Sequence, residues 1–206
     1  MLSRFRKKMG RLLEAAATPL VKLGIGPNAV SVAGFLASLW FLWLSFAGLE
    51  GAERGLLVLA LAISGLMDSL DGVVAKMRGL ESKMGAFVDS VLDRASDSVY
   101  MFSLYKLGLL TAEEMALLLA GSLLVSYARA RAEGLGLECS SIGFAERAER
   151  ILMILAMVFL YAIGLSEFVW PIKVFLIAAV YATLVQRVGY ALRKLPHPSR
   201  RAESSR

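Results

Sequence analysis

Apolar residues occur in six long runs along the chain, and short polar segments separate these runs. A helix that crosses a bilayer needs about 20 mostly apolar residues, because the hydrocarbon core is about 30 Å thick and a helix rises about 1.5 Å per residue. The first run meets this requirement without a single charged residue. The pattern therefore predicts an all-α polytopic membrane protein with six transmembrane helices, at residues 29–48, 55–77, 86–107, 112–132, 148–165 and 169–190.

The N-terminal segment has a different pattern, in which apolar and basic residues recur on opposite sides of a helix. The apolar positions are Leu2, Phe5, Met9, Leu12, Leu13 and Ala16, and the basic positions are Arg4, Lys7, Lys8 and Arg11. We expect residues 2–17 to form an amphipathic helix on the inner membrane surface, with a solvated basic arm as the alternative. The chain then divides into a juxtamembrane segment (1–28), a six-helix membrane domain (29–195) and a disordered tail (196–206).

The composition agrees with a membrane protein and excludes other classes. Hydrophobic residues make up 57% of the chain, and the mean hydropathy is +0.63. The single cysteine, Cys139, excludes an intrachain disulfide scaffold. The net charge is +6, and the basic residues are distributed unequally across the membrane. In the expected topology, 20 of the 23 Lys and Arg residues lie on the side of both termini, and only Arg54, Lys106 and Lys173 lie on the other side. Both termini are therefore expected in the cytoplasm, and no nucleic-acid partner is needed to explain the charge.

Five aspartates lie within the second and third predicted spans, where each charge costs about 2.5–3.5 kcal/mol on insertion scales. Asp68 and Asp71 share one helix face, and Asp89, Asp93 and Asp97 share another. Because the turn between the spans is short, four of these carboxylates converge near the cytoplasmic side. Their mutual repulsion and their oxygen ligands indicate Mg²⁺ or Mn²⁺, with two ions more suitable than one. The alternatives are structural ion pairs or a proton path, and for Asp97 a packing role is an equal alternative.

Residues 68–93 read DSLDGVVAKMRGLESKMGAFVDSVLD. They resemble the signature of the CDP-alcohol phosphotransferase family, D-x-x-D-G-x-x-A-R-x₈-G-x-x-x-D-x-x-x-D. The matching positions are Asp68, Asp71, Gly72, Ala75, Gly85, Asp89 and Asp93. Lys76 departs from the pattern, because a point charge replaces the forked guanidinium of the usual Arg. The resemblance extends over nearly the whole chain apart from its C-terminal end.

The resemblance implies a six-helix membrane enzyme, usually a homodimer, that moves a phosphate-linked group from a CDP-linked donor to an alcohol and releases CMP. It implies that Asp68, Asp71 and Asp89 bind the metal ions. It implies that Asp93 also lies beside the metal and takes the proton of the acceptor hydroxyl as the catalytic base. The residues implied to contact the CDP group are Gly72, Ala75, Lys76 and Ser82, together with Asn28, Ala29, Val30 and Ser31.

Arginines gather on the same side of the membrane as the aspartates, in SYARARAE (126–133), in FAERAERI (144–151) and near the end of the last run. Guanidinium groups bind phosphate in a bidentate manner, so we expect a second anion site and an acceptor that carries its own phosphate. Contact with lipid headgroups is the alternative, and it applies best to Arg129. The predicted phosphate-binding residues are Arg129, Arg131, Arg147, Arg150 and Arg187.

These arginine-rich stretches resemble the phosphatidylinositol-phosphate synthase branch of the family, including its archaeal form. The resemblance implies inositol 1-phosphate as the acceptor, CDP-diacylglycerol or CDP-archaeol as the donor, and a place in phospholipid biosynthesis at the inner cell membrane. Phosphatidylglycerophosphate synthase and an enzyme that joins CDP-inositol to inositol phosphate are alternatives within the family. An ion or proton transporter is the alternative from another class, and it predicts acids spread through the depth of the membrane.

Overall fold

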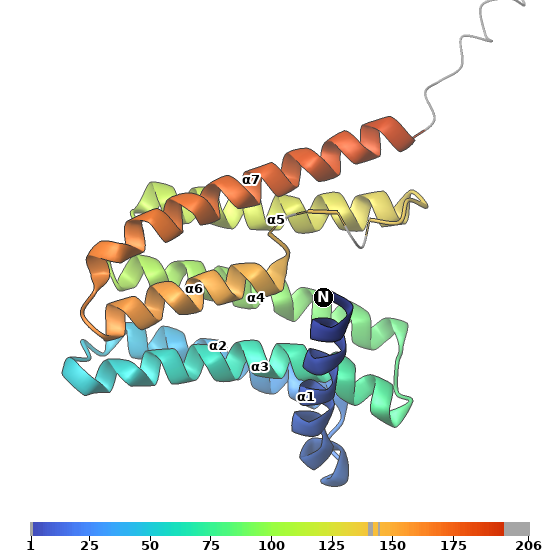
Figure 1. The fold of residues 1–206 in the computed structure, drawn as a ribbon, viewed down its shortest axis with the longest axis horizontal. Helices are drawn as coiled ribbons and strands as arrows, with labels where there is room; N and C mark the ends of the chain where they lie inside the picture. The colour runs from blue at the N-terminus through green and yellow to red at the C-terminus, as the bar shows by residue number, and fades with distance from the viewer. Residues whose placement is uncertain (1, 140–141, 144, 196–206) are drawn as a thin grey trace, which may run out of the picture.

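The computed structural model describes residues 2–139, 142–143 and 145–195, with the side chains of the first helix described from Gly10 onward. All regular elements in this part of the chain are helices, which confirms the all-α class (Figure 1). They are α1 (Leu2–Lys22), α2 (Pro27–Phe46), η1 (Gly51–Arg54), α3 (Gly55–Arg78), α4 (Lys83–Lys106), α5 (Ala112–Gly134), α6 (Arg147–Ala162), η2 (Ser166–Phe168) and α7 (Val169–Lys194).

Four helical segments are long and apolar enough to cross a bilayer, and they correspond to four of the six predicted spans. They are Pro27–Phe46, Gly51–Arg78, Ala112–Gly134 and Ser166–Lys194. The other two predicted spans are α4 and α6. Helix α4 carries several charged side chains within its length. Helix α6 has 16 residues and is therefore about 24 Å long, which is shorter than a hydrocarbon core. The chain is thus a membrane protein, and the count of six spans stays a prediction.

Helices α2 to α7 run roughly along one axis, and α1 crosses them towards the end that carries the α3–α4 turn (Figure 1). Helix α2 packs against both α3 and α4, α6 packs against α3 and α7, and α5 packs against α4 and α7. Glycines permit close approach between some of these helices. A Cβ at Gly121 of α5 would lie 2.7 Å from Val180 Cγ1 of α7. Such contacts matter in a bilayer, where close packing holds helices together because lipid is as apolar as the core.

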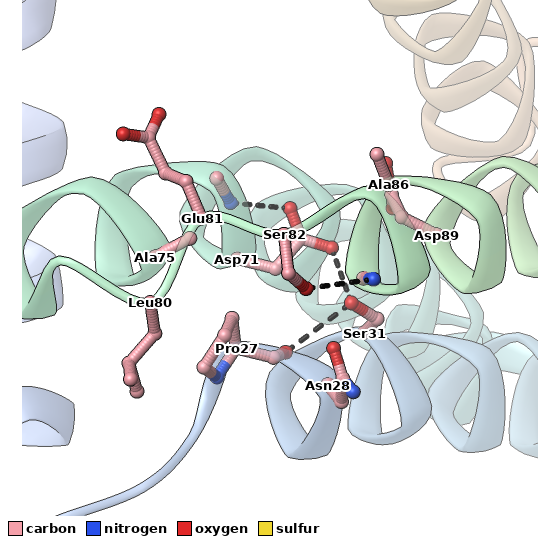
Figure 2. A pocket seen from close by; sticks show the side chains of 12 residues that line it. Pro27, Asn28, Ser31, Asp71, Ala75, Leu80, Glu81, Ser82, Ala86 and Asp89 are labelled. Carbon is pink, nitrogen blue, oxygen red and sulfur yellow. Dashed lines mark hydrogen bonds between the residues drawn. The ribbon is translucent and has the colours of Figure 1, made fainter.

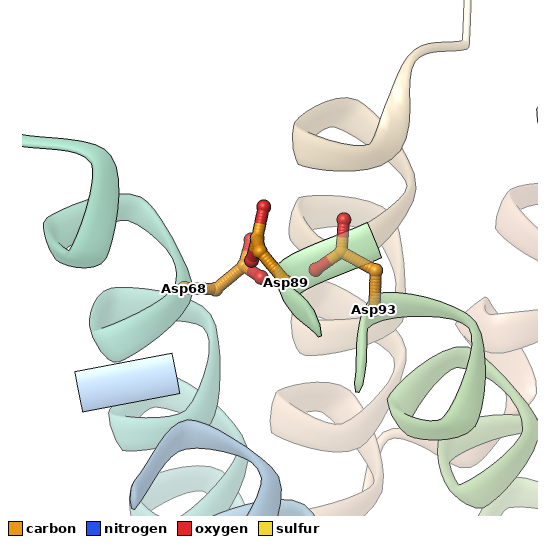
Figure 3. A group of neighbouring side chains, drawn as sticks. All are labelled: Asp68, Asp89 and Asp93. Atoms are coloured by element: carbon orange, nitrogen blue, oxygen red, sulfur yellow. The ribbon is translucent and has the colours of Figure 1, made fainter. Parts of the chain in front are cut away.

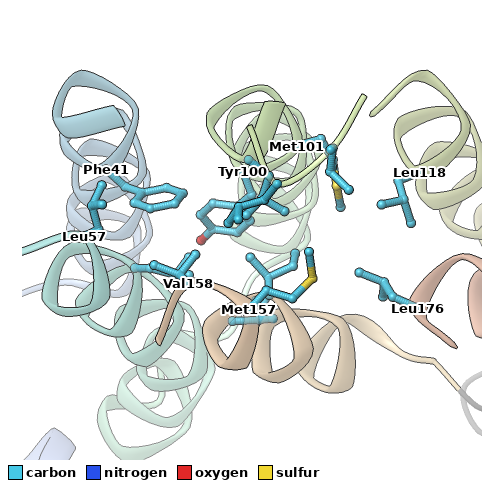
Figure 4. Close-up of a cluster of buried hydrophobic side chains, with 14 of the residues drawn as sticks. Phe41, Leu57, Tyr100, Met101, Leu118, Met157, Val158 and Leu176 are labelled. Atoms are coloured by element: carbon cyan, nitrogen blue, oxygen red, sulfur yellow. The ribbon is translucent and has the colours of Figure 1, made fainter. Parts of the chain in front are cut away.

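The largest apolar core fills the half of the bundle that lies away from the α3–α4 turn. Its fully buried side chains come from six helices, α2 to α7, and include Phe41, Leu57, Tyr100, Leu118, Met157 and Leu176 (Figure 4). The Phe41 and Tyr100 rings meet edge to face, with centroids 6.4 Å apart. This packed half supports the other half of the bundle, where the polar side chains gather.

Helix α1 extends beyond the predicted amphipathic segment, because it continues to Lys22. Its second half packs on α2 and α3 in a small cluster that includes Ala17, Val30 and Val74. Arg78 at the end of α3 donates hydrogen bonds to the carbonyl oxygens of Gly24 and Ile25, at 2.7 and 2.8 Å. The predicted contact of this helix with the membrane surface and the boundaries at residues 28 and 195 stay predictions. The predicted tail, 196–206, lies outside the described residues.

The turn between α3 and α4 determines where the aspartates of these helices stand. Helix α3 is capped by Gly79, whose φ of 62° lies in the left-handed region that glycine adopts without strain. Ser82 caps α4, because its Oγ accepts a hydrogen bond from the Gly85 backbone N at 3.0 Å. Both ends of the turn are therefore fixed, and with them the relative register of the two helices.

Candidate active site

Three aspartates from two helices converge in the polar half of the bundle. Asp68 of α3 and Asp89 and Asp93 of α4 point toward one another (Figure 3). One carboxylate oxygen of each lies within 4.8 Å of the other two. Carboxylate oxygens at this separation suit a hard divalent cation, which takes oxygen ligands at short distance. The chemistry of this donor set therefore fits the predicted divalent metal.

Asp71 lies beside this cluster without belonging to the group of three. Its Oδ2 accepts a hydrogen bond from Ser31 Oγ at 2.7 Å, and its side chain is buried. It nevertheless lines a small cavity together with Asp68, Asp89 and Asp93. All four predicted metal ligands are thus neighbours, and the ligand role of Asp71 stays a prediction.

A pocket of about 220 Å³ lies between the start of α2, the end of α3 and the start of α4 (Figure 2). Five of the residues predicted to contact the CDP group line it: Asn28, Ser31, Gly72, Ala75 and Ser82. A side chain at Gly85 would crowd this wall, because its Cβ would lie 3.1 Å from Ser82 Oγ and 3.3 Å from Asn28 Oδ1. Small residues therefore keep the pocket open for a bulky ligand.

The structure does not bring Ala29, Val30 and Lys76 to this pocket. Successive residues of a helix point about 100° apart, so Asn28 and Ser31 face the pocket while the two residues between them face elsewhere. Val30 is 2% exposed and packs in the cluster beneath α1, and Lys76 is exposed to solvent. Further residues line the pocket that the resemblance does not imply, from the turn and from the first turns of α2 and α4: Pro27, Leu80, Glu81 and Ala86.

A second cavity, of about 430 Å³, lies on the other side of the acidic cluster. Four of the five predicted phosphate-binding residues line it: Arg129, Arg147, Arg150 and Arg187. Arg131 does not line it, and its side chain is exposed. Asp68, Asp89 and Asp93 also line this cavity. Because Asp89 lines the first pocket as well, the aspartate cluster connects that pocket with the arginine-lined cavity.

Arg147 contacts three carboxylates, which the sequence did not predict. It forms ion pairs with Asp68, with Asp93 at 2.7 Å and with Asp97 at 3.3 Å. Arg150, which lies one helical turn further along α6, pairs with Asp97 at 2.8 Å. The fifth aspartate of the two helices is therefore held by arginines of α6. The only sequence signal for this pairing was an acidic residue within an apolar run.

Arg187 and Arg129 have different partners. Arg187 is 4% exposed, and it donates from Nε to the Ile142 carbonyl and from Nη1 to the Val125 carbonyl, each at 2.8 Å. Arg129 pairs with Glu133 of the same helix at 2.8 Å, where both side chains are exposed. Arg187 thus connects α7 to α5 and to the segment before α6, whereas Arg129 keeps access to solvent.

Comparison with known protein sequences agrees with this geometry. The pattern of the CDP-alcohol phosphatidyltransferase family matches residues 25–186. An archaetidylinositol phosphate synthase of Pyrococcus horikoshii is 37% identical over 196 residues, which cover 95% of this chain and 98% of the relative. A protein of the same name from Methanothermobacter thermautotrophicus is 35% identical, covering 95% and 96%. A phosphatidylinositol phosphate synthase of Streptomyces avermitilis is 33% identical, covering 91% and 81%.

Solved structures of the phosphatidylinositol phosphate synthase of Mycobacterium tuberculosis share the fold. The structure with CDP-DAG bound has a TM-score of 0.70 and 27% sequence identity, covering 88% of this chain and 94% of that chain. The structure in complex with manganese and citrate has a TM-score of 0.72 and 25% identity, covering 93% and 98%. By its matching sequence pattern and these relatives, the chain belongs to the CDP-alcohol phosphatidyltransferase family.

Proposed function

We propose that the protein transfers the lipid-linked phosphate of a CDP-lipid to inositol 1-phosphate and releases CMP, as a step of phospholipid biosynthesis. The observation that carries this proposal is the position of the acidic cluster between two cavities of different character. Small residues and the α3–α4 turn line one cavity, and four of the predicted phosphate-binding arginines line the other. Relatives named archaetidylinositol phosphate synthase and a fold neighbour with CDP-DAG bound support the same donor and acceptor.

The donor half of the site is the pocket at the start of α2. In the proposal the CDP group lies against Asn28, Ser31, Gly72, Ala75 and Ser82, which line that pocket. The lipid part is diacylglycerol or archaeol, because both place the same phosphate at the reacting centre. Ala29, Val30 and Lys76 lie outside the pocket, so we assign the donor contacts to the lining residues instead.

The chemistry takes place at the aspartates. The oxygen of an acceptor hydroxyl attacks the lipid-side phosphorus of the donor, the bond from that phosphorus to the CMP oxygen breaks, and the hydroxyl proton passes to a carboxylate. We assign the role of this base to Asp93. Bound Mg²⁺ or Mn²⁺, most suitably as two ions, would supply positive charge that neutralises the phosphate groups. Asp68, Asp71, Asp89 and Asp93 are the residues that would hold it.

The acceptor half is the arginine-lined cavity. Arg147, Arg150 and Arg187 offer buried or half-buried guanidinium groups at its wall, and Arg129 lies at a more exposed place. A phosphate monoester is a dianion near neutral pH, so this positive wall suits an acceptor that carries its own phosphate. The gathering of carboxylates within 4.8 Å argues against acids spread along an ion path.

We propose six spans with both termini in the cytoplasm and the site near the cytoplasmic face of the inner membrane. The basic residues near the α3–α4 turn and both chain ends support this orientation. The charged residues in the middle of α4, Asp89, Asp93 and Arg94, line the acceptor cavity, which is consistent with the low hydropathy of α4 as a span. Helix α1 would then lie on the inner membrane surface, and the chain would form the homodimer implied by the family resemblance.

An acceptor competition tests the proposal. Purified full-length protein in detergent receives Mg²⁺ or Mn²⁺, CDP-archaeol or CDP-diacylglycerol, and labelled inositol 1-phosphate, glycerol 3-phosphate or free inositol. We expect label to enter lipid only from inositol 1-phosphate, with equimolar release of CMP. Transfer from glycerol 3-phosphate instead would replace the acceptor and leave the donor half intact. Transfer only when CDP-inositol replaces the CDP-lipid would replace the donor.

A further inference from the structure

Asp97 is a buried carboxylate that the proposed reaction does not use. Its residue is 4% exposed. The other four aspartates of α3 and α4 each line at least one of the cavities described above, whereas Asp97 lines none of them. It lies eight residues from Asp89, which is about 12 Å along the axis of α4. Because Asp97 lines no cavity, we infer that it acts on the reaction through its neighbours.

The neighbours of Asp97 are two of the arginines of the acceptor cavity. Asp97 Oδ1 accepts a hydrogen bond from Arg147 Nε at 3.3 Å, and Oδ2 accepts one from Arg150 Nη2 at 2.8 Å. Each carboxylate oxygen thus accepts a hydrogen bond from one guanidinium, and the two arginines lie three residues apart on one face of α6. Arg150 also donates from Nη1 to the Ala145 carbonyl at 3.2 Å, so its orientation is constrained from two directions.

Arg147, Arg150 and Arg187 line the acceptor cavity, and Asp97 is the buried carboxylate that pairs with the first two of them. Without the Asp97 charge the three guanidiniums would repel one another in a medium of low polarity. Arg147 would then retain only its other carboxylate partners, Asp68 and Asp93, and would lose the contact that fixes its Nε.

We propose that Asp97 is a positioning residue, which holds Arg147 and Arg150 at the wall of the acceptor cavity and thereby sets the affinity for the phosphate of the acceptor. This inference rests on the proposed function, because it deepens the acceptor half of that site. It assigns a role to the fifth aspartate, which the family signature does not include.

Binding measurements on the full-length protein in detergent test this role without turnover. Isothermal titration calorimetry with Mg²⁺ present gives the Kd for inositol 1-phosphate and, separately, the Kd for CDP. We expect Asp97→Asn to raise the Kd for inositol 1-phosphate about tenfold or more, because it removes a buried partner of two charged groups. We expect the Kd for CDP to stay unchanged, because α2, α3 and the first turns of α4 form that pocket.

Two further variants separate positioning from general structural support. Asp97→Glu keeps the charge but moves the carboxylate by one methylene group, so we expect it also to weaken inositol 1-phosphate binding. Its result decides the question if the melting temperature shows that Asp97→Asn does not fold. Glu114→Gln is the matched control, because it removes the 2.8 Å ion pair with Lys173 between α5 and α7, away from both cavities. We expect Glu114→Gln to bind both ligands as the wild type does.

Two outcomes would overturn the positioning role. One is wild-type affinity for inositol 1-phosphate in both Asp97 variants, and the other is equal weakening of inositol 1-phosphate and CDP. A wild-type protein that binds CDP but no inositol 1-phosphate would refute the proposed acceptor, and the inference with it. That result is recognisable from the wild type alone, so failure of the proposed function and failure of the Asp97 role can be distinguished.

Discussion

Arg147 is the residue through which the two halves of the candidate site are connected. Its guanidinium reaches Asp68 on α3 and Asp93 and Asp97 on α4, and the same side chain lines the arginine-rich cavity. Sequence reasoning assigned Arg147 to the acceptor phosphate and the aspartates to metal and base. It did not predict contact between these groups, because they are 50 or more residues apart in the chain and only the packing of α6 on α3 brings them together.

Asp93 provides the sharpest test at the scale of one residue. Asp93→Asn preserves the shape of the side chain but cannot accept the hydroxyl proton, so we expect transfer to fall about 10²–10⁴-fold. Binding of the CDP-lipid should stay close to the wild type. CMP release measures the rate of transfer, and calorimetric titration measures the binding of the CDP-lipid. Glu149→Gln, on the exposed side of α6, serves as the control with full activity, and ordinary turnover by Asp93→Asn would remove Asp93 as the base.

At the scale of elements, α7 holds the segment that precedes α6. Arg187 donates to the Ile142 carbonyl, and the Ala145 backbone N donates to Thr183 Oγ1 at 2.9 Å. Gly143, with φ of 136°, approaches so closely that a Cβ there would lie 2.4 Å from Thr183 Cγ2. This attachment determines where α6 begins, and therefore where Arg147 and Arg150 stand.

Arg187→Ala should affect both the acceptor and the stability of the fold. We expect the KM for inositol 1-phosphate to rise about tenfold or more while the KM for the CDP-lipid changes little, because Arg187 lines only the acceptor cavity. We also expect a lower melting temperature, since two carbonyls would lose their donor at about 1–3 kcal/mol each. Initial rates and thermal unfolding measure these effects. Arg193→Ala, exposed on the same helix, is the control, and equal rises in both KM values would contradict the assignment.

At the scale of the whole molecule, the bundle places the reacting groups where the helices meet. The apolar half holds α2 through α7 together, and the donor pocket and the acceptor cavity open on opposite sides of the acidic cluster. Helix α2 contributes to the first, α5, α6 and α7 contribute to the second, and α3 and α4 contribute to both. No single helix carries the site, so its ligands should bind only the folded bundle.

A divalent cation should therefore stabilise the protein by binding the folded state alone. We expect Mn²⁺ or Mg²⁺ to raise the melting temperature, with about 2.7 kcal/mol of stabilisation at a concentration of about 100 times Kd. EDTA should reverse the shift and abolish transfer. Thermal unfolding in detergent and label incorporation measure the two effects. In Asp89→Asn the metal-dependent shift should shrink, and a shift as large as in the wild type would place the metal elsewhere.

Much of this protein can be predicted from its sequence, for reasons that are local. Six apolar runs determine helices because a chain in lipid must satisfy its backbone hydrogen bonds internally. The spacing of Asp68, Asp89 and Asp93 around a short turn brings them together, because helical rise and register follow from residue number. Asn28 and Ser31, which the family resemblance implies as CDP contacts, line the donor pocket, whereas Ala29, Val30 and Lys76 do not.

The tertiary structure decided what depends on contacts between distant segments. Glu81 and Ala86 line the donor pocket because α2 lies across both α3 and α4. Asp97 meets Arg147 and Arg150 because α6 packs into the bundle beside α3. Residue spacing describes one helix or one turn, whereas these pairings depend on which helix faces which, and that is set by the packing of the whole bundle.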